Sequence, residues 1–385
     1  MITGRAANLV DANSVFFSSL MFACSHCNTP YPDQGVPYRC PQCGGTYDCA
    51  PLLYRPELIG REATSGIWRY RDTFVLPDIA PEVSLGEGNT PLVWENVSGI
   101  DVAFKCEYQN PTGSFKDRGS ATLISFLCSR GVTQAIEDSS GNAGASLAAY
   151  AARAGIKTRI YIPQSNIGPK QRQIAAYGAE IILVPGPRSN ASDSVLQAVA
   201  NGGVYASHAY LPFNIPGYAT IAYEITEQLG EAPGTFICPV GQGGLLLGAA
   251  RGFSALIAAG KIHRHPVLVG VQAMACAPLY SRYMGYSSTV INTGDGYTMA
   301  EGVRIQAPVR AEELLQAVKE SQGQFIAVAE ADILPGRDEL AHRGFYVEIT
   351  SALVWNAISQ LLSNGKKRIL GPIVVVLTGS GLKTS

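Results

Sequence analysis

A lysine in an unusual setting is the first residue of this sequence that could do covalent chemistry. Lys116 lies in the segment NPTGSFKDRGS, residues 110–120. If Ser114 caps a helix whose first turn includes Lys116, the amine lies near the positive end of that helix. Positive surroundings and burial lower the pKa of an amine, and the neutral amine is the better nucleophile toward an aldehyde. The alternative is a surface lysine paired with Asp117, and the segment alone favours neither reading.

Four cysteines near the N-terminus form a second chemical pattern. The pairs CSHC (24–27) and CPQC (40–43) are separated by twelve residues. Two CxxC turns can direct four thiolates at one ion and close a tetrahedral Zn²⁺ shell, which is typical of a structural site. His26 is an alternative ligand, and a metal-free or redox pair is the alternative function. The predicted ligands are Cys24, Cys27, Cys40 and Cys43.

Three glycine-rich turns follow runs of residues that are typical of buried strands. SSGNAG (139–144) comes after the run at 134–138, GQGG (241–244) after 236–240, and TGSG (378–381) after the apolar run IVVVL (373–377). Parallel α/β sheets bind their ligands at the carboxyl ends of strands. The three turns therefore predict one shared site.

The alternation of short β-branched runs with Ala-rich helical stretches predicts an α/β protein with parallel sheets. The strands expected at 158–163 and 181–184 flank a helix expected at 170–177. We expect a small Cys-rich segment at 1–50 and a catalytic core at 51–385. Within that core we expect a smaller α/β subdomain, about 120–210, inserted in a larger one.

Composition excludes several classes of function. The net charge of −1 gives no broad surface for nucleic acid, and no apolar run reaches the ~20 residues of a membrane helix. An odd count of nine cysteines indicates free thiols in a reducing compartment. The stretch from Val15 to Ala23 has poor flanks for a signal peptide. We therefore expect a cytoplasmic protein.

The segment around Lys116 resembles the cofactor-lysine motif of the threonine synthase family, within the fold-type II pyridoxal-phosphate enzymes. Further motifs are similar to those of that family, occur in the same order and span nearly the whole chain. They are GEGNTPL (86–92), SSGNAG (139–144), GQGG (241–244), AEGVRI (300–305), VEITSA (347–352) and LTGSGLK (377–383). The resemblance implies two parallel-sheet α/β domains of that fold type, with a small zinc-ribbon-like knuckle at the N-terminus.

The resemblance also implies roles for individual residues. Lys116 would bind pyridoxal 5'-phosphate as a Schiff base and later move protons on the substrate. Asn142 would hydrogen-bond the phenolic oxygen of the cofactor, and Thr378 would face the pyridine nitrogen. The cofactor phosphate would be held by Gly241, Gln242, Gly243, Gly244 and Leu245, and the substrate α-carboxylate by Ser139, Ser140 and Ala143.

Two positions depart from the family pattern and bear on the substrate. Threonine synthases usually place a reactive Thr where Ala143 stands, and a Lys where Ala219 stands. A phosphate without a charged partner is costly to bury, so its recognition would have to come from elsewhere. The candidates for phosphate recognition are Lys170, Arg172 and Arg304, and those for other substrate contacts are His208, Tyr210, Asn214 and Tyr218.

Three functions are compatible with these residues. The first is a lyase or synthase like threonine synthase, which would convert O-phosphohomoserine to threonine and phosphate. The second is a β-elimination or β-replacement paralogue, either a serine/threonine dehydratase or a synthase that adds a sulfur nucleophile. The third is a degenerate binding module without activity, which the retained Lys116, Asn142 and Thr378 disfavour. The expected partner is a small amino acid, and we expect a homodimer because two-fold oligomers are the commonest.

Overall fold

A computed structural model describes residues 21–49, 51–55, 66–164, 168–286, 296–363 and 369–383. The stretch that was weighed as a signal-peptide core, 15–23, lies outside the described residues except for its last three. Within the described ranges the structure is a mixed α/β fold with three sheets. The predicted α/β class is confirmed.

The largest sheet has six strands in the order β10-β9-β8-β11-β4-β3. All neighbours run parallel except β3 and β4, which pair antiparallel. The strands are β3 (Leu92–Val97), β4 (Ile100–Lys105), β8 (Thr235–Pro239), β9 (Val267–Ala273), β10 (Gln324–Val328) and β11 (Ile373–Val376).

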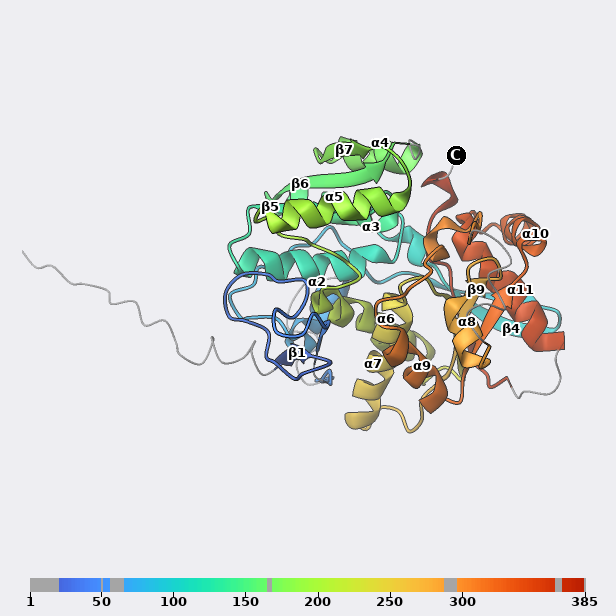
Figure 1. Cartoon of the computed structure of the whole chain (residues 1–385). Coiled ribbons are helices and arrows are strands. Elements are labelled where there is room, and N and C mark those ends of the chain that lie inside the picture. The colour runs from blue at the N-terminus through green and yellow to red at the C-terminus, as the bar shows by residue number, and fades with distance from the viewer. Residues whose placement is uncertain are drawn as a thin grey trace, which may run out of the picture.

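The central strands of this sheet are buried on both faces, which explains their unbroken apolar sequences. In β11, Val375 packs into a core cluster with residues of helix α11 (Ile349–Ser363). Its neighbours Val374 and Val376 pack into a second cluster, with residues of helices α6 (Ile215–Leu229) and α7 (Gly244–Ala258). Helices therefore cover both faces of the sheet, as Figure 1 shows.

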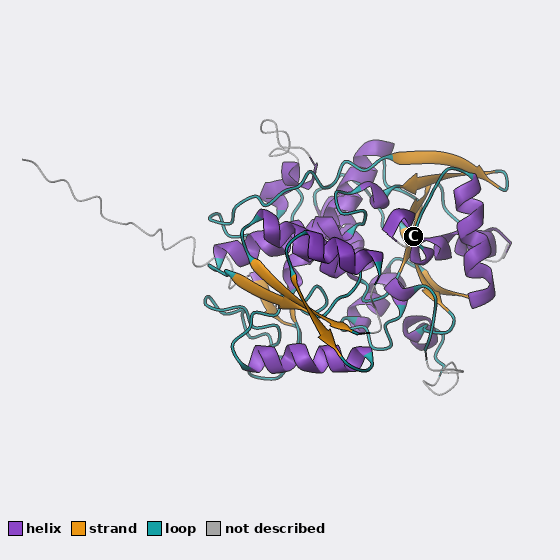
Figure 2. Ribbon diagram, turned by 90° about the horizontal axis from the view of Figure 1, so that it is seen from above, coloured by secondary structure: helices purple, strands orange, loops and turns teal. Residues whose placement is uncertain are grey.

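The chain segment between β4 and β8 forms a second sheet, which has three parallel strands. Its strands, in spatial order, are β5 (Gln134–Glu137), β6 (Lys157–Pro163) and β7 (Glu180–Val184). Figure 2 shows these strands running side by side. The helices of this segment are α3 (Asn142–Arg153), α4 (Pro169–Ala176) and α5 (Arg188–Ala200).

Helix α2 (Lys116–Ser129) contacts both α3 and α6, and it is buried over most of its length. Glycines let α6 and α7 approach closely. A Cβ at Gly248 would lie 2.5 Å from the Tyr218 side chain, and a Cβ at Gly252 would lie 2.5 Å from the Ala219 carbonyl oxygen. The remaining helices are α8 (Pro278–Tyr283), α9 (Ala311–Glu320) and α10 (Glu330–His342), with 3-10 turns at Gly66–Thr73, Glu107–Gln109, Pro212–Asn214, Glu301–Val303 and Gly381–Lys383.

The N-terminal Cys-rich segment carries the third sheet, an antiparallel pair of β1 (Phe22–Cys24) and β2 (Tyr47–Cys49). Its aromatic side chains join it to the catalytic core: the ring centroids of Phe22 and Tyr31 lie 4.7 and 5.0 Å from that of Phe213, which leads into α6. In the parts of the chain that the structure describes, no helix is long and apolar enough to cross a membrane.

Candidate active site

Lys116 is the first residue of helix α2, and the loop that precedes it follows strand β4. Its ammonium nitrogen lies 4.9 Å from the centroid of the Phe115 ring. Burial lowers the pKa of Lys116 to about 8, and the charges of Glu137 and Glu348 oppose this shift. A larger fraction of the amine is therefore neutral near pH 7 than for an exposed lysine.

The expected helix cap and the alternative ion pair are both wrong. The N-cap residue of α2 is Phe115, and no side chain caps the helix. Asp117 does not pair with Lys116, because its carboxylate accepts hydrogen bonds from the Thr112 backbone N–H at 2.6 Å and from the Ser146 hydroxyl at 2.6 Å. Asp117 therefore fixes the loop before the helix and connects it to helix α3.

Arg118, two residues after the lysine, is the centre of a buried charge network. Its guanidinium donates to both carboxylate oxygens of Glu107, at 2.8 and 2.7 Å, and to both of Glu224, at 2.8 and 2.7 Å. The Lys105 ammonium lies 2.9 Å from Glu224. None of these side chains is more than 1% exposed. The network holds the first turn of α2 against the end of β4 and against α6.

The residues predicted to hold the cofactor and the substrate α-carboxylate all line one cavity. It lies at the carboxyl ends of β5, β8 and β11, as the three glycine-rich turns predicted. The predicted residues in its lining are Lys116, Ser139, Ser140, Asn142, Ala143, Gly241, Gln242, Gly243, Gly244, Leu245 and Thr378.

Asn142 and Glu348 meet in this cavity. The Asn142 amide nitrogen donates to both carboxylate oxygens of Glu348, each at 2.9 Å. The Lys170 ammonium lies 3.3 Å from the same carboxylate. The amide oxygen of Asn142 is buried and has no partner in the described chain. The structure thus leaves one polar atom of Asn142 open to a bound group.

The loop from Gly241 to Gly243 leads directly into the N-terminus of helix α7. Gly243 has φ +82°, a left-handed conformation that favours glycine. A Cβ at Gly241 would lie 2.5 Å from the Gly302 carbonyl oxygen. Backbone N–H groups at such a helix start are unpaired within the helix and attract anions. The loop is therefore a suitable place for a phosphate group.

Thr378 follows strand β11 and its side chain is buried. Its hydroxyl oxygen lies 2.8 Å from that of Ser351, in the first turn of helix α11. The Ser351 hydroxyl also accepts a hydrogen bond from the Gly379 backbone N–H at 2.9 Å. The Thr378 hydroxyl is therefore held in place by a side chain from another element.

Several of the residues considered for substrate recognition lie away from the cavity. Ala219 is fully buried where α6 meets α7, so this position does not face the cavity. Arg172 is exposed and is not part of the cavity lining. Tyr210 accepts a hydrogen bond from Arg39 of the Cys-rich segment at 3.0 Å. Lys170, Arg304 and His208 do line the cavity.

Three charged residues of the cavity lining were not predicted as site residues. They are Arg188, Glu301 and Glu348. Glu348 and Glu301 belong to the motifs VEITSA and AEGVRI, which were recognised without a role for their carboxylates. Arg188 had no signal in the sequence, because a lone arginine at a helix start has the pattern of a solvated residue.

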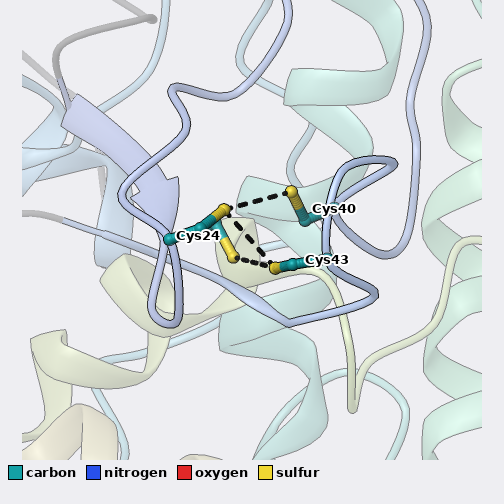
Figure 3. A group of neighbouring side chains, drawn as sticks. Cys24, Cys40 and Cys43 are labelled. Atoms are coloured by element: carbon teal, nitrogen blue, oxygen red, sulfur yellow. Dashed lines mark hydrogen bonds between the residues drawn. The ribbon is translucent and has the colours of Figure 1, made fainter.

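The four predicted zinc ligands converge on one point, and Figure 3 labels three of them, Cys24, Cys40 and Cys43. Their sulfur atoms all lie within 4.8 Å of one another, and the sulfurs of Cys24 and Cys43 are 3.4 Å apart. Those of Cys27 and Cys40 are 3.7 Å apart. A tetrahedral shell with Zn–S bonds of about 2.3 Å has sulfurs roughly 3.8 Å apart. The residues present therefore fit a zinc ion.

The family described as "Pyridoxal-phosphate dependent enzyme" matches residues 83–379 of the chain. The threonine synthase of Methanocaldococcus jannaschii is 34% identical over 373 residues, covering 90% of this chain and 92% of that protein. The chain belongs to the threonine synthase family of pyridoxal-phosphate-dependent enzymes. The threonine synthase of a Synechocystis species is 35% identical and covers 82% of each chain.

Among solved structures, maize serine racemase superposes on this member of the family with a TM-score of 0.64 at 23% identity. The match covers 76% of this chain and 88% of that one, and it shows the shared fold alone. The family match and the threonine synthase relatives confirm the predicted family and a pyridoxal-phosphate-dependent lyase activity. The solved structure confirms the fold type.

The cavity of this family member fits pyridoxal phosphate on structural grounds. The unpartnered oxygen of Asn142, which lines the cavity, is a polar atom that a hydrogen-bond donor of a bound group can satisfy. The glycine loop at the start of α7 suits its phosphate, and the amine of Lys116 suits its aldehyde. When bound, the cofactor supplies an electron sink for the carbanion at the substrate Cα.

Proposed function

We propose that this enzyme converts O-phosphohomoserine and water to threonine and phosphate. The observation that carries the proposal is its similarity to proteins named threonine synthase, over most of both chains. The lining of the cavity supports it. Besides Lys116, that lining carries three cationic side chains, those of Lys170, Arg188 and Arg304.

Arg304 is the residue we assign to the substrate phosphate. Lys170 already pairs with Glu348, and Arg188 lies 3.8 Å from Asp138. Within the described ranges Arg304 makes no ion pair with a carboxylate, and its guanidinium lies 5.4 Å from the centroid of the Tyr297 ring. An arginine can hold a phosphate by two parallel hydrogen bonds. Arg304 is therefore the cation that we assign to hold the substrate phosphate.

Within this proposal each predicted site residue keeps its role. Lys116 binds the cofactor aldehyde and moves protons at the substrate Cα, and Asn142 fixes the plane of the ring. Thr378 faces the ring nitrogen. The loop 241–245 holds the cofactor phosphate, and the segment 139–143 receives the substrate carboxylate.

The test is the product of the holoenzyme. Incubation with O-phosphohomoserine is expected to release phosphate and threonine in equal amounts, measured by a phosphate assay and by amino-acid chromatography. Phosphate without threonine, or neither product, would reject the proposal. The Lys116→Ala variant is the control, because it lacks the reactive amine.

A second candidate function rests on Ala143. This residue lines the cavity where threonine synthases usually place a reactive Thr, and dehydratase-like relatives more often have Ala there. On this alternative the enzyme eliminates water from serine or threonine, or replaces a leaving group of a phosphorylated or acetylated serine with a sulfur nucleophile. Formation of 2-oxo acids from serine or threonine, with no reaction of O-phosphohomoserine, would favour it.

The remaining assignments stay part of this proposal. We propose that zinc fills the four-cysteine site, that the protein works in the cytoplasm and that it forms a homodimer. We also propose a division into residues 1–50 and 51–385, with a smaller subdomain at about 120–210. Neither a nucleic-acid partner nor a membrane partner is proposed.

A further inference from the structure

A second, smaller cavity lies beside Lys116 and shares part of its lining with the main cavity. Its volume is about 10 Å³, which is close to the minimum that one water molecule needs. Its lining combines polar residues that carry hydrogen-bonding atoms with small and apolar ones: Lys116, Gly119, Ser120, Leu123, Glu137, Ala143, Leu147, Ala206, His208, Asn214 and Tyr218. Lys116, Ala143 and His208 line the main cavity as well.

Two buried oxygen atoms on residues of this small cavity have no partner in the described chain. They are Oε2 of Glu137 and Oδ1 of Asn214, on residues that are each 1% exposed. Unpartnered polar atoms at this depth are rare, and an ordered water commonly satisfies them. Both residues line this cavity, so a water molecule there is a candidate partner for each oxygen.

The other ends of both side chains are fixed. Oε1 of Glu137 lies 3.0 Å from Nδ1 of His208, and the Asn214 amide donates to the His208 carbonyl oxygen at 2.6 Å. Burial raises the pKa of Glu137 well above its ordinary value, and burial also lowers the pKa of His208. A carboxylate with a raised pKa binds a proton more readily than an exposed one does.

We propose that Glu137 and Asn214 hold the water molecule that adds to Cβ of the substrate, and that Glu137 takes its proton. This inference rests on the proposed function, in which loss of phosphate from Cγ is followed by hydration. The water oxygen forms a bond to Cβ while its O–H bond breaks, and the proton passes to Oε2 of Glu137. Lys116 delivers a proton to Cα, so that H and OH add across the Cα–Cβ double bond. His208 is a positioning residue that orients the carboxylate.

Ala143 is consistent with this arrangement. Its methyl group borders both cavities and supplies no hydroxyl to hold a water molecule. The carboxylate of Glu137, at the end of β5, supplies a proton acceptor on the same side of the site as Lys116. The structure thereby gives a physical reason why hydration can proceed without a threonine at position 143.

The experiment measures how the reaction partitions after phosphate has left. Holoenzyme and variants react with O-phosphohomoserine, and phosphate, threonine and 2-oxobutyrate are quantified together. An intermediate that is released without hydration at Cβ hydrolyses to 2-oxobutyrate and ammonia. For Glu137→Gln we expect phosphate release within about threefold of wild type, and a ratio of threonine to phosphate at least tenfold lower, with 2-oxobutyrate making up the difference.

Two further variants make the outcome specific. Asp138→Asn alters the neighbouring buried carboxylate, which is held by Tyr205 and Ser192 and is not part of the lining of either cavity. It should keep the wild-type ratio. Glu137→Asp keeps the carboxylate and should give an intermediate ratio of threonine to phosphate. If Glu137→Gln fails to bind the cofactor, the ratio measured for Glu137→Asp tests the role of Glu137 instead.

The possible failures are distinguishable. If wild-type enzyme makes threonine and a cofactor-loaded Glu137→Gln keeps the same ratio, or loses phosphate release and threonine to the same extent, the role of Glu137 is wrong and the proposed function stands. If wild-type enzyme forms no threonine, the proposed function fails and this role fails with it.

Discussion

Arg118 and Glu224 form a two-fold hydrogen-bonded ion pair that is shielded from solvent. Nη1 of Arg118 lies 2.8 Å from Oε1 of Glu224, and Nη2 lies 2.7 Å from Oε2. Glu107 accepts from the same guanidinium, and Lys105 donates to Glu224. Because Arg118 is two residues from Lys116, these ions fix the backbone that carries the reactive amine. The site is thus built on a buried charge network.

Loss of one anion from this network should destabilise the fold strongly. Glu224→Gln leaves Lys105 and Arg118 with less compensating charge, and we expect it to lower the free energy of unfolding by about 3–5 kcal/mol. The measurement is chemical denaturation. Glu227→Gln, one turn away, removes a partly exposed partner of Arg69 and should cost less than about 1 kcal/mol. Equal losses for the two variants would contradict the account.

The network also marks the limit of what the sequence could predict. Strands at 236–240 and 373–377 were placed within about one residue, because continuous apolar runs between glycine-rich turns allow little else. The residues at strand ends, such as Asn142 and Thr378, were placed in one cavity by the same argument. The partners of Arg118 could not be predicted, because Glu224 is 106 positions away and pairing at that distance depends on how α6 packs.

Local geometry explains why the predicted orientations of two side chains, Ser114 and Ala219, were wrong. Ser114 was expected to cap α2, but the helix begins one residue later than such a cap requires and the hydroxyl points to no described partner. Ala219 was expected to face the substrate, but the helical turn directs it against α7. A family motif fixes which residues are present, whereas the direction of each side chain follows from packing.

The four-cysteine site should bind one zinc ion and stabilise the fold. Cys27→Ser replaces an exposed ligand, and we expect loss of zinc, measured by elemental analysis, together with a lower melting temperature. Cys128→Ser, a half-buried cysteine outside the cluster, should keep the zinc content of wild type. A wild-type protein purified without chelator that contains no zinc would contradict the assignment.

Attachment of the cofactor should follow the titration of Lys116. Its pKa is lowered to about 8, and only the neutral amine attacks an aldehyde. Below pH 8 the observed rate should fall about tenfold per pH unit, and above pH 8 it should level off. The measurement is stopped-flow absorbance after cofactor is added to the apoprotein. A rate that keeps rising to pH 10 would indicate an ordinary, exposed amine.

Arg304 should recognise the substrate phosphate. Removal of a charged hydrogen-bond partner costs about 1.5–3 kcal/mol, so Arg304→Gln should raise KM for O-phosphohomoserine roughly 10–100-fold with a smaller effect on kcat. Arg172→Gln, in the exposed part of α4, is the matched control and should leave KM unchanged. An unchanged KM in Arg304→Gln would assign the phosphate to another cation.

The position of the covalent link to the cofactor tests the central claim most directly. The chain offers competing amines, because Lys170 lines the same cavity and burial lowers the pKa of Lys383 to about 8. Holoenzyme is reduced with borohydride and digested, and the modified peptide is identified by mass spectrometry. The account predicts modification at Lys116, and its loss together with the visible absorption in Lys116→Ala. Modification at Lys170 or Lys383, or at no lysine, would contradict it.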